Sequence, residues 1–222
     1  MPKNSITQPG IVLSTNNLRE ADIVFTLLGK NSGKISVIAR SAKASKKRFM
    51  GGIQIFDVAT FCTNAGRNQS NWYSLEAIRD RAPWDTLLIS PRRYTLASCL
   101  LELTNEFTAE GDSESGAVFV QLYKCLKALQ KANSPAAELS ITCFYFLILH
   151  RVSGFDSTEL ELNTSLRIWF ESMLENQLPI VPNQEELLAG GIVHLLSYTE
   201  QVLGKKLKSA GEVRSLSSVR FF

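Results

Sequence analysis

The first 80 residues alternate between short apolar runs and turn residues, a pattern typical of β-strands. Strands are predicted over residues 10–15, 23–28, 35–39, 53–62 and 72–78. The clearest is 35–39, where Ile35, Val37 and Ala39 alternate with Ser36 and Ile38. The sequence K-N-S-G at 30–33 indicates a hairpin turn, because glycine adopts positive φ at low cost. Five short strands favour a small barrel, and the OB-fold is a common five-stranded barrel that binds oligonucleotides.

After residue 80 the apolar positions recur every three or four residues, which is the spacing of helices. Ser90 is a good N-cap, Pro91 suits a first helical position, and Asn183 can cap the last predicted helix. Helices are predicted from there to before Gly111 and over 115–131, 135–152 and 184–203, and residues 162–174 are compatible with another. The 135–152 helix is apolar nearly all round, which indicates a central, buried position. Two adjacent glycines, 190 and 191, predict a close helix contact.

The expected fold class is therefore α+β with two domains, an OB-fold barrel over residues 1–80 and an all-α domain over 81–222. Hydrophobic residues make up 45% of the chain, an ordinary globular value. No apolar run approaches the roughly 20 residues that span a bilayer, and the first ten residues lack the apolar core of a secretory signal. A cytoplasmic protein without membrane contact is expected.

Charge is divided unevenly between the two predicted domains. Residues 1–80 hold eleven Lys and Arg against five Asp and Glu, whereas residues 81–222 hold thirteen against sixteen. Between Asp22 and Asp57 there are seven basic residues and no acid. Such a concentrated positive field attracts polyanions, nucleic acid first. The alternative is a solvated loop that keeps the barrel soluble.

The chain offers little for bond-making chemistry. Its four cysteines are far apart without a C-x-x-C, so they are interpreted as buried structural thiols, and neither metal nor cofactor is expected. The two histidines, His150 and His194, fall within helices without a partner motif. The segment 29–35 imitates a phosphate-binding loop but is one residue short, with Ile35 where Ser or Thr is needed. These features argue against an enzyme.

Nucleic-acid binding remains, centred on S-A-K-A-S-K-K-R-F at 41–49 between two predicted strands. Lysine ammonium groups there can form ion pairs with phosphates, and arginine guanidinium groups can donate two hydrogen bonds to one phosphate. Phe49, Trp72 and Tyr73 could stack on unpaired bases if exposed, although strand aromatics usually belong to a core.

The same stretch resembles the bacterial recombination mediator family RecO. Residues 27–56 match its turn ending in G-K, its strand ending in A-R, its basic loop and its L-Q-P-F step, with Ser41 at a usual glycine and Ile55 at a usual proline. Residues 94–106, the Gly-aromatic step ending at Phe155 and the L-G-K-K-L-K-S run at 203–209 are also similar to the family.

The resemblance implies an OB-fold joined to a helical domain that binds single- and double-stranded DNA and anneals complementary strands. It also implies action with RecR and help to RecA in displacing the single-strand DNA-binding protein. Many members carry a four-cysteine zinc site after the Gly-aromatic step, but residues 154–182 hold no cysteine, so no zinc-finger insertion is expected. The predicted DNA-binding residues are Lys34, Arg40, Lys43, Lys46, Lys47, Arg48, Arg92 and Arg93.

A partner site is also implied for the acidic tail of the single-strand DNA-binding protein. The cationic cluster Lys205, Lys206 and Lys208, at the end of the last predicted helix, is the candidate, with simple helix capping as the alternative. The function predicted is a DNA repair and recombination mediator. The alternatives are an OB-fold RNA-binding protein and a helical scaffold that does not bind DNA.

Overall fold

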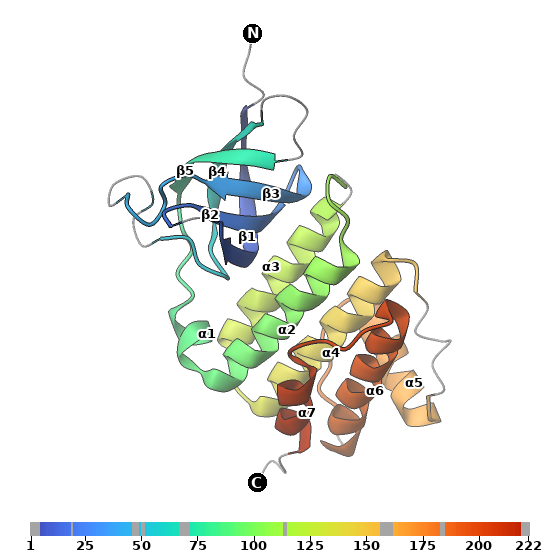
Figure 1. Cartoon of the computed structure of the whole chain (residues 1–222). Coiled ribbons are helices and arrows are strands. Elements are labelled where there is room, and N and C mark those ends of the chain that lie inside the picture. Colours follow the sequence, from blue (N-terminus) through green and yellow to red (C-terminus); the bar gives the residue numbers. More distant parts are fainter. Residues whose placement is uncertain are drawn as a thin grey trace. The chain divides into compact units, whose positions relative to one another are not determined.

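The computed structural model describes residues 5–18, 20–45, 49, 52–66, 72–112, 115–155, 162–182 and 185–218. The chain forms two compact units (Figure 1). The barrel unit comprises Met1–Trp84 and Thr108–Val120, and the helical unit comprises Asp85–Phe107 and Gln121–Phe222. The chain therefore leaves the barrel unit, returns to it between two helices, and leaves it again.

The barrel unit is built on five strands that close into a barrel. They are β1 (Ser5–Asn17), β2 (Ile23–Gly29), β3 (Gly33–Ala39), β4 (Val58–Ala65) and β5 (Trp72–Arg79). Their order is β1-β2-β3-β5-β4, antiparallel except for a short parallel pairing of β3 with β5. This is the topology of an OB-fold, so the predicted fold class is confirmed.

Inward-facing apolar side chains fill the barrel, as the alternation of β3 predicts. Ile35, Val37 and Ala39 point inward, together with Phe25, Leu27, Phe61 and Leu75 from the other strands. Phe49 joins this core and is only 2% exposed. Of the two interpretations open from the sequence, base stacking and a core position, the second holds for Phe49, because its ring fills the barrel interior.

Two strand boundaries differ from the sequence prediction. β1 begins at Ser5 rather than Gly10, because its first half pairs with β4 and only its second half with β2. The sequence pattern gives no sign of this extension, because Pro9 lacks the N–H that a strand residue donates to its neighbour. β4 begins at Val58, because Ile53 and Phe56 enter the core from a turn rather than from a strand.

The helices follow the predicted spacing with two additions. They are α1 (Asp85–Ile89), α2 (Pro91–Phe107), α3 (Gly116–Lys131), α4 (Pro135–Val152), α5 (Thr164–Asn176), α6 (Glu185–Leu203) and α7 (Ala210–Ser218). α1 and α7 were not predicted, since both are short, at five and nine residues. The predicted cap Asn183 lies outside the described residues.

The central position predicted for the 135–152 helix is confirmed. α4 packs against α2, α5 and α6, and nearly all of its side chains from Glu138 to His150 are buried (Figure 1). Ser134 caps its N-terminus by accepting the Ala137 N–H. The close contact predicted at the paired glycines holds for Gly191, where a Cβ would lie 2.6 Å from the ring of Trp169 on α5.

Candidate nucleic-acid interface

The outer face of the barrel carries a row of small polar side chains that ends at a tryptophan. The strand register aligns Ser14 of β1, Thr26 of β2, Ser36 of β3 and Trp72 of β5. The Ser14 hydroxyl donates to Thr26 Oγ1 at 3.0 Å. Side chains this short leave the pleated surface open, so a flat ligand can approach it closely.

Trp72 is the exposed tryptophan of the three. It is 39% exposed, whereas Trp84 and Trp169 are each 5% exposed. Its neighbour Tyr73 faces the other way, as strand alternation requires. Of the three aromatic residues considered from the sequence, Trp72 therefore has the exposure needed for stacking on a base.

Cations stand at both ends of β3. Lys34 is two residues from Ser36 along β3, so the two side chains share a side of the strand. Arg40 is exposed and directly follows the end of β3 at Ala39. Arg40 lies six positions after Lys34, which corresponds to roughly 20 Å along an extended chain. Lys43 follows on the loop after β3 and is exposed. Lys46, Lys47 and Arg48 lie outside the described residues.

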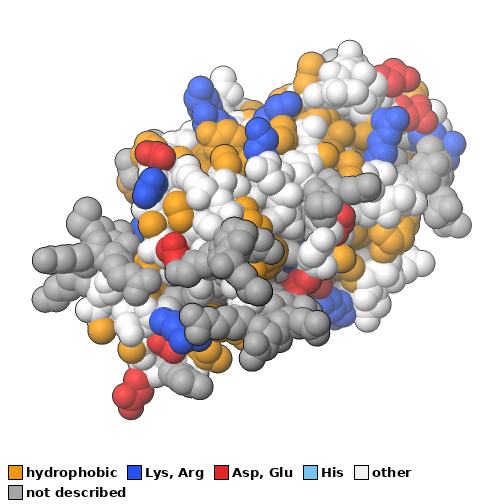
Figure 2. Space-filling view, turned by 90° about the horizontal axis from the view of Figure 1, so that it is seen from above, with side chains coloured by type: hydrophobic (Ala, Val, Ile, Leu, Met, Phe, Trp, Pro, Cys, Tyr) orange, Lys and Arg blue, Asp and Glu red, His pale blue; other side chains and the backbone are white. Residues whose placement is uncertain are grey.

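The start of the basic loop is held in place by the turn between β1 and β2. Ser41 has φ 54°, in the left-handed region that favours glycine, and its N–H donates to the Asp22 carboxylate at 2.8 Å. The Lys43 N–H donates to the Ala21 carbonyl at 3.1 Å. On the face shown in Figure 2, basic side chains are interspersed with acidic and hydrophobic ones among the described residues.

The segment that imitates a phosphate-binding loop is the hairpin turn between β2 and β3. Buried Gln8 accepts the N–H groups of Asn31 and Ser32 at 2.8 and 3.0 Å and donates to Ser32 Oγ at 2.6 Å. Gly33 takes φ 64°, which confirms the predicted turn. The backbone N–H groups that a phosphate would need are thus already satisfied, which supports rejecting the nucleotide site.

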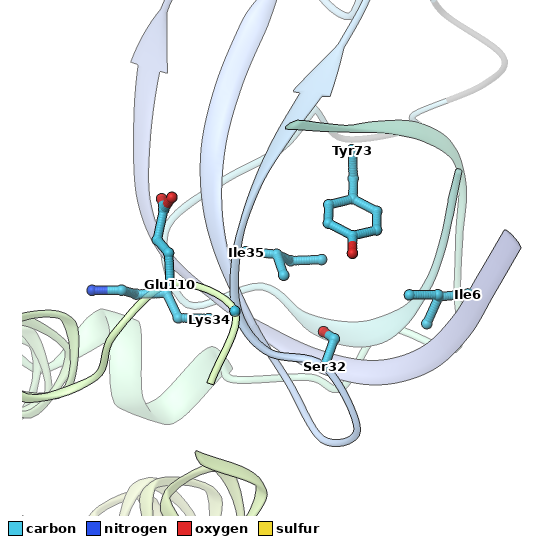
Figure 3. A pocket seen from close by; sticks show the side chains of 7 residues that line it. Ile6, Ser32, Lys34, Ile35, Tyr73 and Glu110 are labelled. Carbon is cyan, nitrogen blue, oxygen red and sulfur yellow. The ribbon is translucent and has the colours of Figure 1, made fainter. Parts of the chain in front are cut away.

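A pocket of about 370 Å³ opens beside this turn (Figure 3). Ile6, Lys34, Ile35 and Tyr73 line it from the strands, Ser32 lines it from the turn, and Glu110 and Gly111 complete it. Glu110 and Gly111 come from the connector between α2 and α3, which belongs to the barrel unit. Nothing in the sequence pattern pointed to this connector, because its contact with β3 joins residues 74 positions apart.

Comparison with known proteins gives a family match for the barrel strands. Residues 1–81 match the family model described as recombination protein O N terminal. This part of the chain is therefore similar to the RecO N-terminal domain. The resemblance to RecO read from the sequence is thereby confirmed.

Curated relatives extend the RecO similarity into the helical unit. The DNA repair protein RecO of Desulfosudis oleivorans is 28% identical over 135 residues, which is 61% of this chain and 52% of that protein. That of Thermoanaerobacter sp. is 29% identical over 124 residues, or 54% of this chain and 47% of the relative. That of Syntrophus aciditrophicus is 31% identical over 102 residues, or 46% and 39%. The chain thus matches about half the length of the first two RecO relatives.

Arg92 and Arg93, assigned to DNA contact from the sequence, are bound within the helical unit. The two Nε atoms donate to the two oxygens of Glu138 on α4, at 2.9 and 2.7 Å. Arg93 also donates to the carbonyls of Gln130 and Ala132 at the end of α3. Both side chains are about one-fifth exposed. They join α2, α3 and α4, and we do not include them in the candidate nucleic-acid interface.

The lysine cluster lies between two helices, not at the end of the last one. The prediction that the 184–203 helix is the final one is wrong, because α7 follows it. Lys205 pairs with Glu106 at 2.6 Å, and Glu102 accepts the N–H of Lys208 at 2.7 Å. Lys206 and Lys208 remain exposed. Of the candidate partner cluster, these two side chains are the most available to a ligand.

The cysteines and histidines have no reactive arrangement in the described part of the chain. Burial raises the pKa of the Cys99 and Cys125 thiols to about 12, and that of Cys143 is also raised by burial. No group of His, Cys, Asp and Glu suited to a metal is found among the described residues. Within the same part of the chain, no helix has the length and apolar character needed to cross a membrane.

His150 is buried in the helical unit, where burial lowers its pKa to about 4. Thr199 Oγ1 donates to the Leu195 carbonyl, so it accepts from His150 Nε2, 2.9 Å away. The imidazole is therefore neutral, with Nδ1 as the acceptor nitrogen. Phe107, Phe146 and Tyr198 surround the ring edge-on. A neutral, enclosed histidine supports the structural interpretation made from the sequence.

Proposed function

We propose that this protein is a DNA repair and recombination mediator that binds single- and double-stranded DNA with its barrel and anneals complementary strands. The observation that carries the proposal is the outer face of β3, where Lys34 and Arg40 flank exposed Trp72. The OB-fold uses the corresponding face of its second and third strands for oligonucleotides. The match of residues 1–81 to the RecO N-terminal family supports the same function.

The mechanism is binding, with no bond made or broken and no cofactor. Lysine and arginine neutralise phosphates on both strands, which lowers the repulsion between the strands and allows them to pair. Trp72 stacks on unpaired bases and so holds a strand open for its complement. We further propose that the protein acts with RecR and helps RecA to replace the single-strand DNA-binding protein, as its RecO relatives' names suggest a repair role.

Annealing is the decisive experiment. Complementary DNA strands coated with the cognate single-strand DNA-binding protein should pair faster when this protein is added. Equal affinity for RNA without annealing of DNA would favour an RNA-binding protein instead. Absence of binding to DNA would favour a scaffold.

Trp72 gives a direct spectroscopic test of the surface. Because the other two tryptophans are buried, quenching of tryptophan fluorescence by single-stranded DNA should report on Trp72. Trp72→Leu should abolish the quenching and weaken binding by about 1–3 kcal/mol, the contribution of one stacked base. Tyr94→Leu is the matched control, since Tyr94 is a similarly exposed aromatic residue, 43% exposed, on α2. Unchanged affinity of Trp72→Leu would move the site away from β3.

Salt dependence tests the basic loop. If about five phosphates of single-stranded DNA are neutralised, log K should fall against log salt with a slope near −3.5. Replacing Lys43, Lys46, Lys47 and Arg48 together with alanine should flatten this slope. An unchanged slope in the folded variant would show that the phosphates meet other cations.

A further inference from the structure

An acidic connector runs beside the first half of β3 in the barrel unit. Glu110 forms a parallel bridge with Lys34, and the Gly111 N–H donates to the Lys34 carbonyl at 2.9 Å. The connector occupies the edge that β5 leaves open, because β5 pairs with β3 only from Ser36 to Ile38. Backbone bonds therefore fix Glu110 at the border of the proposed DNA surface.

The Glu110 side chain is held on the same row as Trp72. Ser36 Oγ donates to Glu110 Oε1 at 2.6 Å, and Ser36 is the register partner of Trp72 on the outer face. Adjacent strands are about 4.8 Å apart, which is close to the reach of one base. The carboxylate is exposed, and its second oxygen, Oε2, accepts from none of the described residues.

A carboxylate at this place selects what can lie next to Trp72. It repels the phosphate backbone, so it is the edge of a stacked base that meets Glu110. A carboxylate only accepts hydrogen bonds. Cytosine offers its N4 amino group as a donor, whereas uracil and thymine offer O4, an acceptor, at the same position.

We propose that Trp72, Ser36 and Glu110 form a base-reading subsite that favours an unpaired base with an exocyclic amino group, cytosine above all, over uracil or thymine. The indole supplies the stacking surface, Ser36 orients the carboxylate, and Oε2 accepts the amino hydrogen. This inference rests on the proposed binding of single-stranded DNA, and it adds a preference that phosphate contacts cannot give.

The test compares the affinities for oligo-dC and oligo-dU of equal length. At each base these differ in the amino or keto group at C4 and in the N3–H that uracil carries and cytosine lacks. Fluorescence anisotropy at pH 8 and one salt concentration gives both dissociation constants. The unmodified protein should favour oligo-dC, and Glu110→Gln should lower that preference about threefold or more, since a glutamine amide can accept from cytosine or donate to uracil. Ser36→Ala, which releases the carboxylate, should reduce the preference in the same direction.

Asp112→Asn is the matched control. It removes one negative charge from the same connector, but Asp112 accepts from Ser115 Oγ at 2.9 Å rather than from β3. The preference for oligo-dC should survive in this variant. Equal binding of the two oligonucleotides by the unmodified protein, or an unchanged preference in Glu110→Gln, would overturn the subsite alone. Failure to bind either oligonucleotide would overturn the subsite and the proposed function together.

Discussion

The helical unit and the barrel unit use their basic side chains in different ways. In the helical unit, Arg92 and Arg93 share Glu138, Lys205 pairs with Glu106, and Arg214 pairs with Glu200. The hydrogen bond from Arg214 is the main cause that lowers the pKa of Glu200. In the barrel unit, Lys30, Arg40 and Lys43 are exposed, and no ion pair joins them to another described residue.

This difference shows that a count of charges does not locate a binding surface. A cation that already holds a carboxylate has little to gain from a phosphate, since it must first give up its partner. Lys30, Arg40 and Lys43 have no such partner among the described residues, unlike Arg81 of the same unit, which pairs with Asp57. The comparison therefore predicts that changes in the helical unit alter stability, whereas changes on the barrel face alter ligand affinity.

The largest effect is expected at Glu138. Glu138→Gln leaves two guanidinium groups, each about one-fifth exposed, without their carboxylate. The free energy of unfolding should fall by about 3 kcal/mol, the lower range for breaking a buried pair. Denaturant titration measures this change. The DNA affinity of the folded variant should be unchanged. A large loss of affinity would contradict the conclusion that the helical unit's ion pairs serve stability and not DNA binding.

The next effect concerns pH and His150. Its pKa is about 4 in the folded protein and about 6.5 when unfolded, so the unfolded chain takes up the proton first as the pH falls. The histidine's contribution to stability is complete above pH 6.5 and declines toward pH 4, by up to about 3 kcal/mol.

The measurement is the difference in unfolding free energy between the unmodified protein and His150→Gln from pH 7 to pH 4. The difference should shrink as the pH falls, because the variant has no proton to bind there. His194→Gln, at the other histidine of the chain, is the control and should show a smaller change, since His194 is less buried. A constant difference for His150→Gln would contradict the lowered pKa.

A smaller effect is expected at the hairpin turn of the barrel. A Cβ at Gly29 would lie 2.5 Å from Gln8 Nε2 and 2.6 Å from Ser32 Oγ, so Gly29→Ala collides with the side chain that holds the turn. Gln8→Ala should cost about 1–3 kcal/mol, because it leaves the Asn31 and Ser32 N–H groups without their acceptor.

A double-mutant cycle sharpens this prediction. Gly29→Ala should lower the free energy of unfolding less in the Gln8→Ala background than in the unmodified protein, since the Gln8 side chain that the new Cβ would contact is then absent. Denaturant unfolding of the four proteins gives the coupling free energy. Additive costs would mean that the glycine is required for another reason.

The smallest effect is expected at the lysine cluster. If Lys206 and Lys208 bind the acidic tail of the single-strand DNA-binding protein, reversing both to glutamate should weaken binding of a tail peptide by at least about 1 kcal/mol. Calorimetric titration with the peptide measures this. DNA affinity should change little. Lost DNA affinity with intact peptide binding would assign the cluster to DNA instead.

Much of the fold could be predicted because it depends on local patterns. Alternation around Ile35 and Val37 predicted β3, and the apolar surface of residues 135–152 predicted the central helix. Ser41, interpreted as a departure from the usual glycine, occupies a left-handed turn in which glycine would be less strained. The short helices α1 and α7 were not predicted, because five and nine residues are too few to show a clear helical repeat in the sequence.

The candidate site was predictable only in part. The basic stretch and Trp72 could be named from residue types, since charge and aromatic character are visible in the sequence. Phe49 and Tyr73 could not be separated from Trp72, because the face that each side chain takes depends on how the strands and the loop close the barrel. The part of the prediction that falls on Lys46, Lys47 and Arg48 stays a prediction.

By itself, the sequence determined the order of strands and helices, the concentration of positive charge in the first 80 residues and the resemblance to RecO. Only the tertiary structure decided which charges are available. Glu138 reaches Arg92 and Arg93 across 46 and 45 residues, and Glu110 reaches Ser36 across 74. Hydrophobic periodicity fixes a residue's face within its own element, whereas the partner of a charge depends on which elements pack together, and no local pattern records that.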